Sequence, residues 1–212
     1  MKLYDFFRSG TSHRLRIALN LKGLTYEQVA IDLRREEHLA AAYGTINAQH
    51  LVPALEMDGT VLTQTPAIIE WLEERYPATP LLPFDSLERA HVRALAAIIG
   101  CDVHPINNRR ILEALRHDFG ADEAAINRWC RIWIGAGFDA YQALLEARGA
   151  GGDFSFGDGP SVADAYLIPQ IESARRFKVD LERWPRLMAI DAACAKLEAF
   201  QRAAPSAQPD AS

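Results

Sequence analysis

Cysteine is scarce in this sequence. Its 212 residues include only Cys101, Cys130 and Cys194, and no two of them form a Cys-x-x-Cys motif. An odd number of widely separated cysteines argues against a disulfide framework and is typical of proteins in a reducing compartment. We therefore expect free thiols and a fold that is held together by its hydrophobic core.

Long apolar runs and an excess of positive charge are also missing. No uncharged apolar stretch approaches the roughly 18 residues of a membrane-spanning helix. The first residues, MKLYDFFRSG, include charged side chains and lack the apolar core of a signal peptide. The formal net charge of -5 disfavours non-specific binding to nucleic acids or membrane surfaces. The sequence thus predicts a cytoplasmic protein without nucleic-acid or membrane partners, and no residue pattern indicates a metal site.

Residues 1–80 alternate between strand and helix patterns. Apolar and aromatic runs predict strands over 2–7, 26–33 and 52–57 and from 61 onward. Helical spacing predicts helices over 14–22, 36–43 and 63–76. Asp58-Gly59 between the last two strands is a strong hairpin signal. The resulting order β-α-β-α-β-β-α indicates an α/β domain.

A proline-rich segment, with Pro77, Pro80 and Pro83, then separates two regions of different character. Beyond it the pattern is helical only, and helices are expected over 87–115, 121–148, 161–177 and 184–200. The predicted organisation is an α/β domain over 1–80, a linker over 81–86 and an all-helical domain over 87–212. The small polar residues from Pro205 onward are expected to fray.

Two strand-to-helix junctions in the first domain carry polar residues suited to anions. Ser9-Gly10-Thr11-Ser12 follows the first strand. A helix N-terminus with a hydroxyl donor lowers the pKa of a nearby thiol, which is about 8.5 for free cysteine. Gln64-Thr65 opens the third helix, where unpaired backbone N–H groups attract carboxylates. Helix capping without any ligand is the alternative interpretation of both junctions.

Five longer motifs carry a family resemblance. They are FFRSGTSHRLRIAL (Phe6–Leu19), VPALEMDG (Val52–Gly59), LTQTPAIIEWLEERYP (Leu62–Pro77), DVHPINNRRIL (Asp102–Leu112) and SVADAYLIPQIESARRFKVDL (Ser161–Leu181). In this order, over nearly the whole chain, they resemble the zeta class of glutathione transferases, with the bacterial maleylpyruvate isomerases as the nearest group. The resemblance implies a thioredoxin-like N-terminal domain, an all-α C-terminal domain, glutathione as cofactor and a homodimer.

The resemblance assigns the thiol site to Ser9, Gly10 and Thr11. The class usually has Ser-Ser-Cys here, and its first serine, which Ser9 matches, is thought to help the thiolate. Because Gly10 and Thr11 replace the other two residues, either Ser9 or Thr11 could donate to the sulfur. Val52-Pro53 implies a cis peptide bond and a Val52 backbone that pairs with the cysteinyl unit of glutathione. A strand-edge proline without a ligand is the alternative.

Further glutathione contacts are implied in both domains. His38 and Gln49 match positions near the glycyl end of glutathione, and the γ-glutamyl carboxylate is assigned to Gln64 and Thr65. The second domain is expected to contribute Asp102, His104, Asn108, Arg109 and Arg110. Asp102 is expected to meet the γ-glutamyl amine, either within its own subunit or across a dimer interface. A kinked, solvated helix face is the alternative for this segment.

Substrate binding is assigned to a basic set: Arg8, His104, Arg109, Arg110 and Arg176. Guanidinium groups bind carboxylates in a bidentate manner, and Arg176 matches a family arginine near the substrate carboxylate. A surface arginine paired with a nearby acid is its alternative interpretation. Arg8 and Arg176 join Ser9 and Thr11 as the predicted catalytic residues. Arg14 and Arg16 are interpreted as solvent or interface residues, and Ser161–Asp164 as a capping box.

The implied activity is a glutathione-dependent cis–trans isomerisation in aromatic catabolism. The substrate is maleylpyruvate, from the gentisate pathway, or maleylacetoacetate, and the product is the corresponding fumaryl compound. The thiolate adds to the double bond, the resulting single bond rotates, and elimination returns glutathione. The alternatives are a conjugating or dehalogenating transferase, a non-enzymatic interaction protein of this fold, and a glutaredoxin-like reductase. The last is disfavoured because Ser9–Ser12 contains no cysteine.

Overall fold

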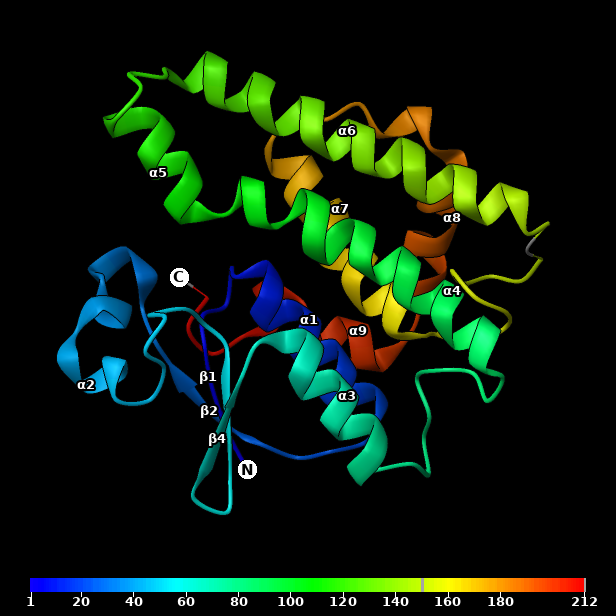
Figure 1. Cartoon of the computed structure of the whole chain (residues 1–212), viewed down its shortest axis with the longest axis horizontal. Helices are drawn as coiled ribbons and strands as arrows, with labels where there is room; N and C mark the ends of the chain where they lie inside the picture. Colours follow the sequence, from blue (N-terminus) through cyan, green and yellow to red (C-terminus); the bar gives the residue numbers. More distant parts are fainter. Residues whose placement is uncertain (150, 212) are drawn as a thin grey trace. The chain divides into compact units, whose positions relative to one another are not determined.

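The computed structural model describes residues 1–149 and 151–211, and the chain forms two compact units (Figure 1). The first unit consists of Met1–Leu81 together with the segment that begins at Lys196, and the second unit consists of Leu82–Ala195. The first boundary falls at the predicted linker. The predicted helical domain, by contrast, included the residues from Lys196 onward, which the structure groups with the first unit.

A four-stranded sheet forms the centre of the first unit. Its strands are β1 (Lys2–Asp5), β2 (Glu27–Ala30), β3 (Ala54–Met57) and β4 (Thr60–Thr63), in the order β2-β1-β3-β4. β1 is parallel to β2 and antiparallel to β3, and β3 pairs antiparallel with β4. The predicted hairpin is confirmed: Asp58 and Gly59 have φ of 51° and 80°, as a tight turn of this kind requires.

Helices pack on this sheet through an apolar core. The helical elements of the unit are α1 (Gly10–Leu21), η1 (Leu33–Arg35), η2 (Glu37–Leu39), α2 (Ala41–Gly44), α3 (Thr65–Arg75), α9 (Glu198–Ala203) and η6 (Pro205–Ala207). Leu3 of β1, Leu55 of β3, Leu15 of α1 and Leu72 of α3 are fully buried. The element order and the mixed sheet match the predicted thioredoxin-like domain.

Two helix predictions in this unit need correction. α1 starts at Gly10, earlier than the expected position 14, because Ser9 caps the helix as soon as the first strand has ended. The helix expected over 36–43 is divided into the 3-10 turn η2 and the short helix α2. Glu36, just before η2, has a left-handed backbone with φ 59°, and Ala40, between η2 and α2, is extended, so no continuous α-helix forms.

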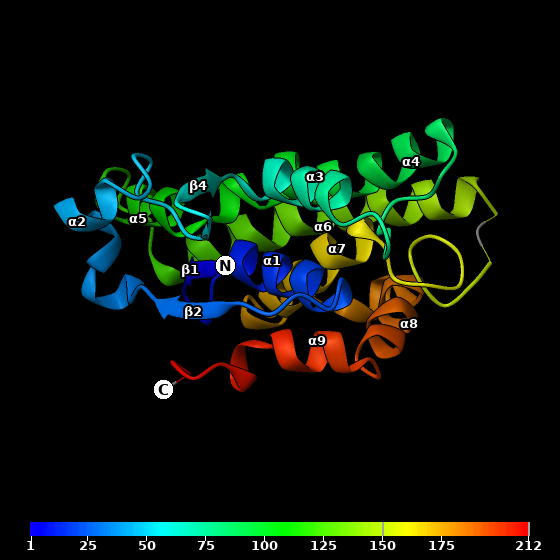
Figure 2. The ribbon, with the colours of Figure 1, turned by 90° about the horizontal axis from the view of Figure 1, so that it is seen from below.

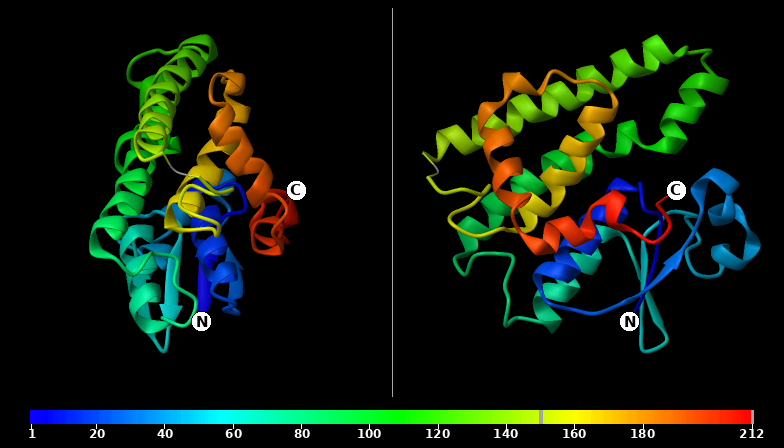
Figure 3. Two further views of the ribbon diagram at one scale, coloured as in Figure 1. Left: turned by 90° about the vertical axis from the view of Figure 1, so that its right-hand side faces the viewer. Right: turned by 180° about the vertical axis from the view of Figure 1, so that it is seen from behind.

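The C-terminal segment is ordered instead of frayed. α9 lies along α1, as Figures 2 and 3 show, and the side-chain amide of Asn20 donates to the carbonyl of Ala199 at 3.0 Å. Gln208 is buried and its amide donates to the carbonyls of Arg202 and Ala204, both at 2.8 Å. Side-chain bonds to the backbone thus fix a segment whose small, polar composition suggested disorder.

The second unit is entirely helical in its described residues. Its elements are α4 (Ser86–Ala97), η3 (Ile98–Val103), η4 (Pro105–Asn107), α5 (Arg109–His117), α6 (Glu123–Ala147), α7 (Val162–Arg176), η5 (Leu181–Arg183) and α8 (Pro185–Cys194). The predicted capping box is present at the start of α7, where Asp164 accepts from the backbone N–H and the hydroxyl of Ser161. No helix among the described residues is long and apolar enough to cross a membrane.

The single helix expected over 87–115 is broken into four elements. η3 is a π-helical turn, and Pro105, which has no N–H to donate, follows it directly. Two close approaches hold this turn: an added Cβ on Gly100 would lie 2.7 Å from the ring of Tyr166, and one on Gly137 would lie 2.1 Å from Val103. The helix expected over 184–200 is likewise divided, into α8 and α9.

Candidate functional site

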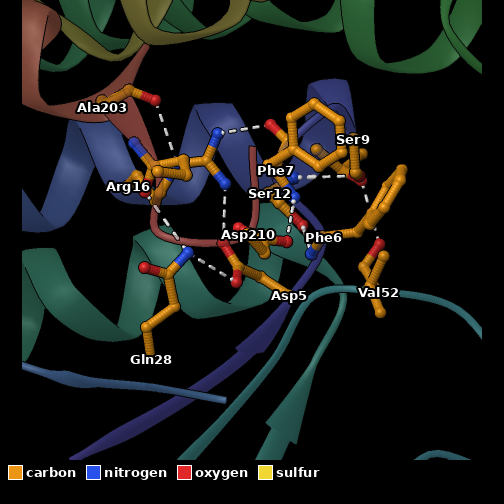
Figure 4. A network of polar contacts seen from close by, with 12 residues as sticks. Asp5, Phe6, Phe7, Ser9, Ser12, Arg16, Gln28, Val52, Ala203 and Asp210 are labelled. Atoms are coloured by element: carbon orange, nitrogen blue, oxygen red, sulfur yellow. Dashed lines mark hydrogen bonds and ion pairs between the residues drawn. The ribbon is translucent and has the colours of Figure 1, made fainter. Parts of the chain in front are cut away.

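Hydroxyl groups gather where β1 leads into α1. Ser9 is the N-cap of α1, and its Oγ accepts a hydrogen bond from the backbone N–H of Ser12 at 3.3 Å (Figure 4). The first turn contains no acidic residue, so no carboxylate there neutralises the positive end of the helix dipole. Capping therefore accounts for the local structure of Ser9 and leaves this helix end suited to an anion.

Two hydroxyls form a relay from this helix end to Val52. The side-chain oxygens of Ser9 and Thr11 lie 3.0 Å apart, and Thr11 donates to the carbonyl of Val52 at 3.0 Å. Each hydroxyl has one proton, so Thr11, which donates to Val52, accepts from Ser9. A ligand that takes over the carbonyl of Val52 would release the proton of Thr11 for another acceptor.

Val52 is fixed on the same side of the unit. The Val52-Pro53 peptide bond is cis, as the resemblance implies. The side chain of Val52 is buried and belongs to an apolar cluster with Phe6, Phe7 and Tyr43. The backbone of Val52 is thus held against the end of the first strand, next to the hydroxyl pair.

The start of α3 forms a second anion-binding feature. Its N-cap, Gln64, has φ 67°, and no side chain among the described residues caps the helix. A non-glycine residue in this backbone region costs of order 1–3 kcal/mol and is typical of functional sites. The amide of Gln64 donates to the side-chain oxygen of Gln49 at 2.5 Å. The hydroxyl of buried Thr65 accepts from buried Arg14 at 2.9 Å, which places a cation beside this helix end.

A histidine to which the sequence gave no role positions the neighbouring loop. Nδ1 of His50 lies 2.7 Å from the carbonyl oxygen of His38, so Nδ1 carries the proton. An added Cβ on Gly44 would lie only 2.9 Å from the His50 ring, which shows how closely these segments pack. This contact links η2, which contains His38, to His50, and so fixes the position of η2 relative to the neighbouring Gln49.

Arg14 and Arg16 are not solvent residues, and this interpretation was wrong. Their exposures are 3% and 0%. Arg16 forms an ion pair with buried Asp5 at 2.6 Å and donates to the carbonyl of Phe7 at 2.9 Å. Burial, and the positive charge of Arg16, also lower the pKa of His13 to about 3. The polar side chains of His13, Arg14 and Arg16 on α1 therefore point into the protein. Among them, Arg16 holds Phe7, which lies two residues before Ser9.

The second unit presents its predicted residues around the broken helix. Asp102 lies on η3 and is exposed, and half-buried His104 is the residue that follows η3. π-helical turns are frequent at functional sites. Asn108 is the N-cap of α5 and accepts from the backbone N–H of Ile111 at 3.3 Å, so its side chain has a clear structural function.

The three predicted arginines of this unit are exposed. Arg109 and Arg110 open α5, and Nε of Arg109 lies 4.0 Å from the carboxylate of Glu113. Arg176 ends α7 and donates to the hydroxyl of Ser173 at 3.2 Å. Arg8 of the first unit is exposed as well. Each of these guanidinium groups is therefore accessible to an anion from solvent.

Comparison with known proteins decides the family. The sequence matches the model of the glutathione S-transferase N-terminal domain over residues 8–75 and that of the C-terminal domain over residues 110–200. The chain belongs to the glutathione S-transferase family. A maleylpyruvate isomerase from a Ralstonia species is 66% identical over 210 residues, which cover 99% of each chain. The predicted family resemblance is confirmed.

Solved structures of other glutathione S-transferases agree with the fold. One, a holo maleylpyruvate isomerase described as a zeta-class bacterial enzyme, has a TM-score of 0.98 at 65% identity and covers 100% of both chains. A maleylacetoacetate isomerase from Anaeromyxobacter dehalogenans, with bound dicarboxyethyl glutathione and citrate, has a TM-score of 0.86 at 41% identity, with 100% of this chain and 93% of that chain covered. The predicted transferase fold, with its two kinds of domain, is confirmed.

Sequence reasoning missed the buried support of this site. His13, Arg14 and Arg16 are buried on α1, and Asp210, from the C-terminal segment, accepts from the backbone N–H of Phe7. One signal was available, because two arginines among the apolar positions of a helix have few places to point except inward. Asp210 is 203 residues from its partner Phe7, and no local pattern indicates such a contact.

Proposed function

We propose that this glutathione S-transferase is a glutathione-dependent cis–trans isomerase that converts maleylpyruvate to fumarylpyruvate. The proposal rests on the hydroxyl pair of Ser9 and Thr11 at the N-terminus of α1, beside the carbonyl of Val52. The similarity to a maleylpyruvate isomerase over the whole chain supports this substrate. Maleylacetoacetate, which differs from it in chain length, is the second substrate to test.

The residues of the first unit fit glutathione. Val52 offers a backbone carbonyl whose bond to Thr11 a ligand amide can replace. The uncapped start of α3, with Thr65 and the buried guanidinium of Arg14 behind it, suits the γ-glutamyl carboxylate. The amides of Gln49 and Gln64, already bonded to each other, offer further polar contacts.

Thiol activation follows from the electrostatics of the α1 N-terminus. The free thiol has a pKa of about 8.5, and a helix N-terminus with hydroxyl donors stabilises the thiolate over the thiol. If a ligand amide takes the carbonyl of Val52, the O–H of Thr11 can donate its hydrogen bond to Ser9 or to the sulfur instead. Ser9, whose Oγ also accepts from Ser12, then donates outward. We infer that Ser9 is the principal donor and that Thr11 sets its direction.

The substrate is a dianion, and exposed arginines suit it. When bound, glutathione supplies a thiol that adds reversibly to the cis double bond and so allows rotation about it. Arg8, Arg109, Arg110 and Arg176 bind the carboxylates and stabilise the negative charge that develops on the keto oxygen. No electrons are lost and no group is transferred, since elimination restores both the thiol and the double bond.

We further propose a cytoplasmic homodimer that acts in the gentisate pathway. The second unit exposes Phe84 by 103% and Leu87 by 66%, and apolar side chains of this size on a surface are typical of protein contacts. Sedimentation equilibrium tests the dimer, and a monomer at assay concentration contradicts it. A monomer would also exclude any role of Asp102 across a dimer interface.

The activity is tested with maleylpyruvate and a glutathione concentration far below that of the substrate. An isomerase converts all of the substrate and leaves the glutathione unchanged, because the thiol returns in every cycle. A conjugating transferase stops when the glutathione is consumed. The same assay with maleylacetoacetate ranks the two substrates by kcat/KM. No glutathione-dependent turnover of either compound would refute the proposed function.

A further inference from the structure

In the turn that presents Arg8 and Ser9, the backbone N–H and C=O groups of Phe6 and Phe7 are all hydrogen-bonded. The N–H of Phe6 donates to the hydroxyl of Ser12 at 3.4 Å, and its carbonyl accepts from the N–H of Ser9 at 3.0 Å. The N–H of Phe7 donates to the carboxylate of Asp210 at 3.0 Å, and its carbonyl accepts from Arg16 at 2.9 Å. Phe7 is therefore held on both sides by charged groups (Figure 4).

One of these two charged groups comes from the C-terminal segment, and the other is anchored to it. Asp210 belongs to the segment itself, while the Nε of Arg16 donates to the carbonyl of Ala203 at 3.0 Å. Gln28, on β2, bonds to Asp5 at 2.9 Å and to Gln208 at 3.3 Å, which joins the segment to the same network. The C-terminal segment is thus part of the hydrogen-bond network that holds the turn before Ser9.

The other carboxylate oxygen of Asp210, Oδ1, is buried and has no hydrogen-bond partner among the described residues. Burying an unpaired acceptor costs of order 1–3 kcal/mol, so this carboxylate is a poor choice for stability alone. Its contribution is the charge-assisted bond to Phe7, which is stronger and more directional than a bond to a neutral acceptor.

We propose that Asp210 is a positioning residue for the thiol site: by holding the N–H of Phe7, it fixes the turn from Phe6 to Ser9 and so directs the hydroxyl of Ser9. Phe7 also packs in the apolar cluster that contains Val52. A shift of Phe7 therefore disturbs both ends of the hydroxyl relay. This inference rests on the proposed function, because it concerns the donor that activates glutathione.

The test compares Asp210→Ala with Asp210→Asn in the full chain. The asparagine variant keeps an oxygen that accepts from Phe7 and removes only the charge, whereas alanine removes both. Glu198→Ala is the matched control, because Glu198 is an acid of the same segment whose ion pair with Arg202 is long at 3.9 Å and exposed. Thermal unfolding of each variant checks that it is folded.

The pKa of the bound glutathione thiol, read from thiolate absorbance, is the first measurement. Asp210→Ala should raise it by about one unit and lower kcat about tenfold at neutral pH, with the KM for glutathione within about twofold. Neither Asp210→Asn nor Glu198→Ala should raise the thiol pKa or lower kcat. Removal of a negative charge alone would lower the thiol pKa, so a rise in the alanine variant reports lost positioning.

Three results would overturn the proposal: an unchanged thiol pKa in Asp210→Ala, an equal impairment of Asp210→Asn, or a loss confined to KM. Amide hydrogen exchange without glutathione separates this proposal from the proposed function. Phe7 and Ser9 should exchange faster in Asp210→Ala and at the wild-type rate in Asp210→Asn. If the wild type fails to lower the thiol pKa, the proposed function fails, and the exchange rates alone still decide whether Asp210 holds the turn.

Discussion

In the first unit, Thr11 is bonded to Val52 and Gln64 to Gln49, so residues far apart in the sequence hold one another in place. In the second unit, Arg110 and Arg176 stand exposed on helix surfaces. The first arrangement suits a cofactor that is the same molecule in every catalytic cycle. The second, built on long flexible side chains, suits substrates that change shape during the reaction. The comparison indicates that changes in the first unit affect stability and thiol chemistry, and changes in the second affect substrate affinity.

The largest effect is expected when the buried ion pair is broken. Arg16→Met leaves the carboxylate of Asp5 buried and unpaired, which typically costs about 3–5 kcal/mol of unfolding free energy. Arg110→Ala, on the exposed start of α5, should change the unfolding free energy by less than about 0.5 kcal/mol. Urea denaturation measures both. If the two variants have equal unfolding free energies, the arginines of the two units do not differ in their contribution to stability.

Loss of the hydroxyl donors should come next. Ser9→Ala removes the principal donor, so we expect kcat/KM to fall about 100-fold, in line with the loss of one preorganised donor. Thr11→Ala should have a smaller effect, because a ligand amide can still bond to Val52. Thiol titration of each complex identifies the donor. If Thr11→Ala shows the larger shift, the assignment of roles is reversed.

The stability of the protein should also depend on pH, because of His13 in the first unit. Burial holds the pKa of His13 at about 3 in the folded chain, against 6.5 for an exposed histidine. The unfolded chain therefore binds the extra proton between these values, and stability falls as the pH drops through this window. From pH 7 to pH 5 the loss is about 2 kcal/mol. His13→Gln should unfold with a weaker pH dependence over the same range, as urea midpoints at several pH values would show.

The smallest effect should appear in the second unit. Arg176→Ala removes one charge-assisted contact to the substrate carboxylate, so KM for maleylpyruvate should rise about tenfold. The bound thiol should keep its pKa, which separates this variant from those at Ser9. Arg175→Ala is the neighbouring control, because Arg175 is already paired with Asp191. Equal losses in the two variants would exclude a specific role for Arg176.

The sequence predicted local features better than distant ones. The hairpin at Asp58-Gly59 and the capping box at Ser161 depend on neighbouring residues, and both are present. The break near Pro105 was not predicted, and the sequence suggested a kink there only in an alternative interpretation, since a π-helical turn depends on how closely Gly100 and Gly137 let other helices approach.

The candidate site follows the same rule. Ser9 and Thr11 lie together because they share one helix start, and this much could be predicted. The orientation of Arg14 toward Thr65 depends on the contact between α1 and α3, which the sequence pattern does not specify. Asp210 required knowledge of where the C-terminal segment returns.

The first unit is discontinuous along the chain, since the segment from Lys196 onward follows the whole of the second unit. During synthesis, strands β1 to β4 therefore leave the ribosome long before α9, which packs on α1. Until then the face of α1 that later contacts α9 is uncovered, and the N–H of Phe7 lacks its acceptor, Asp210. The helical unit in between can fold first, so competence to bind glutathione should arise late in the life of the nascent chain.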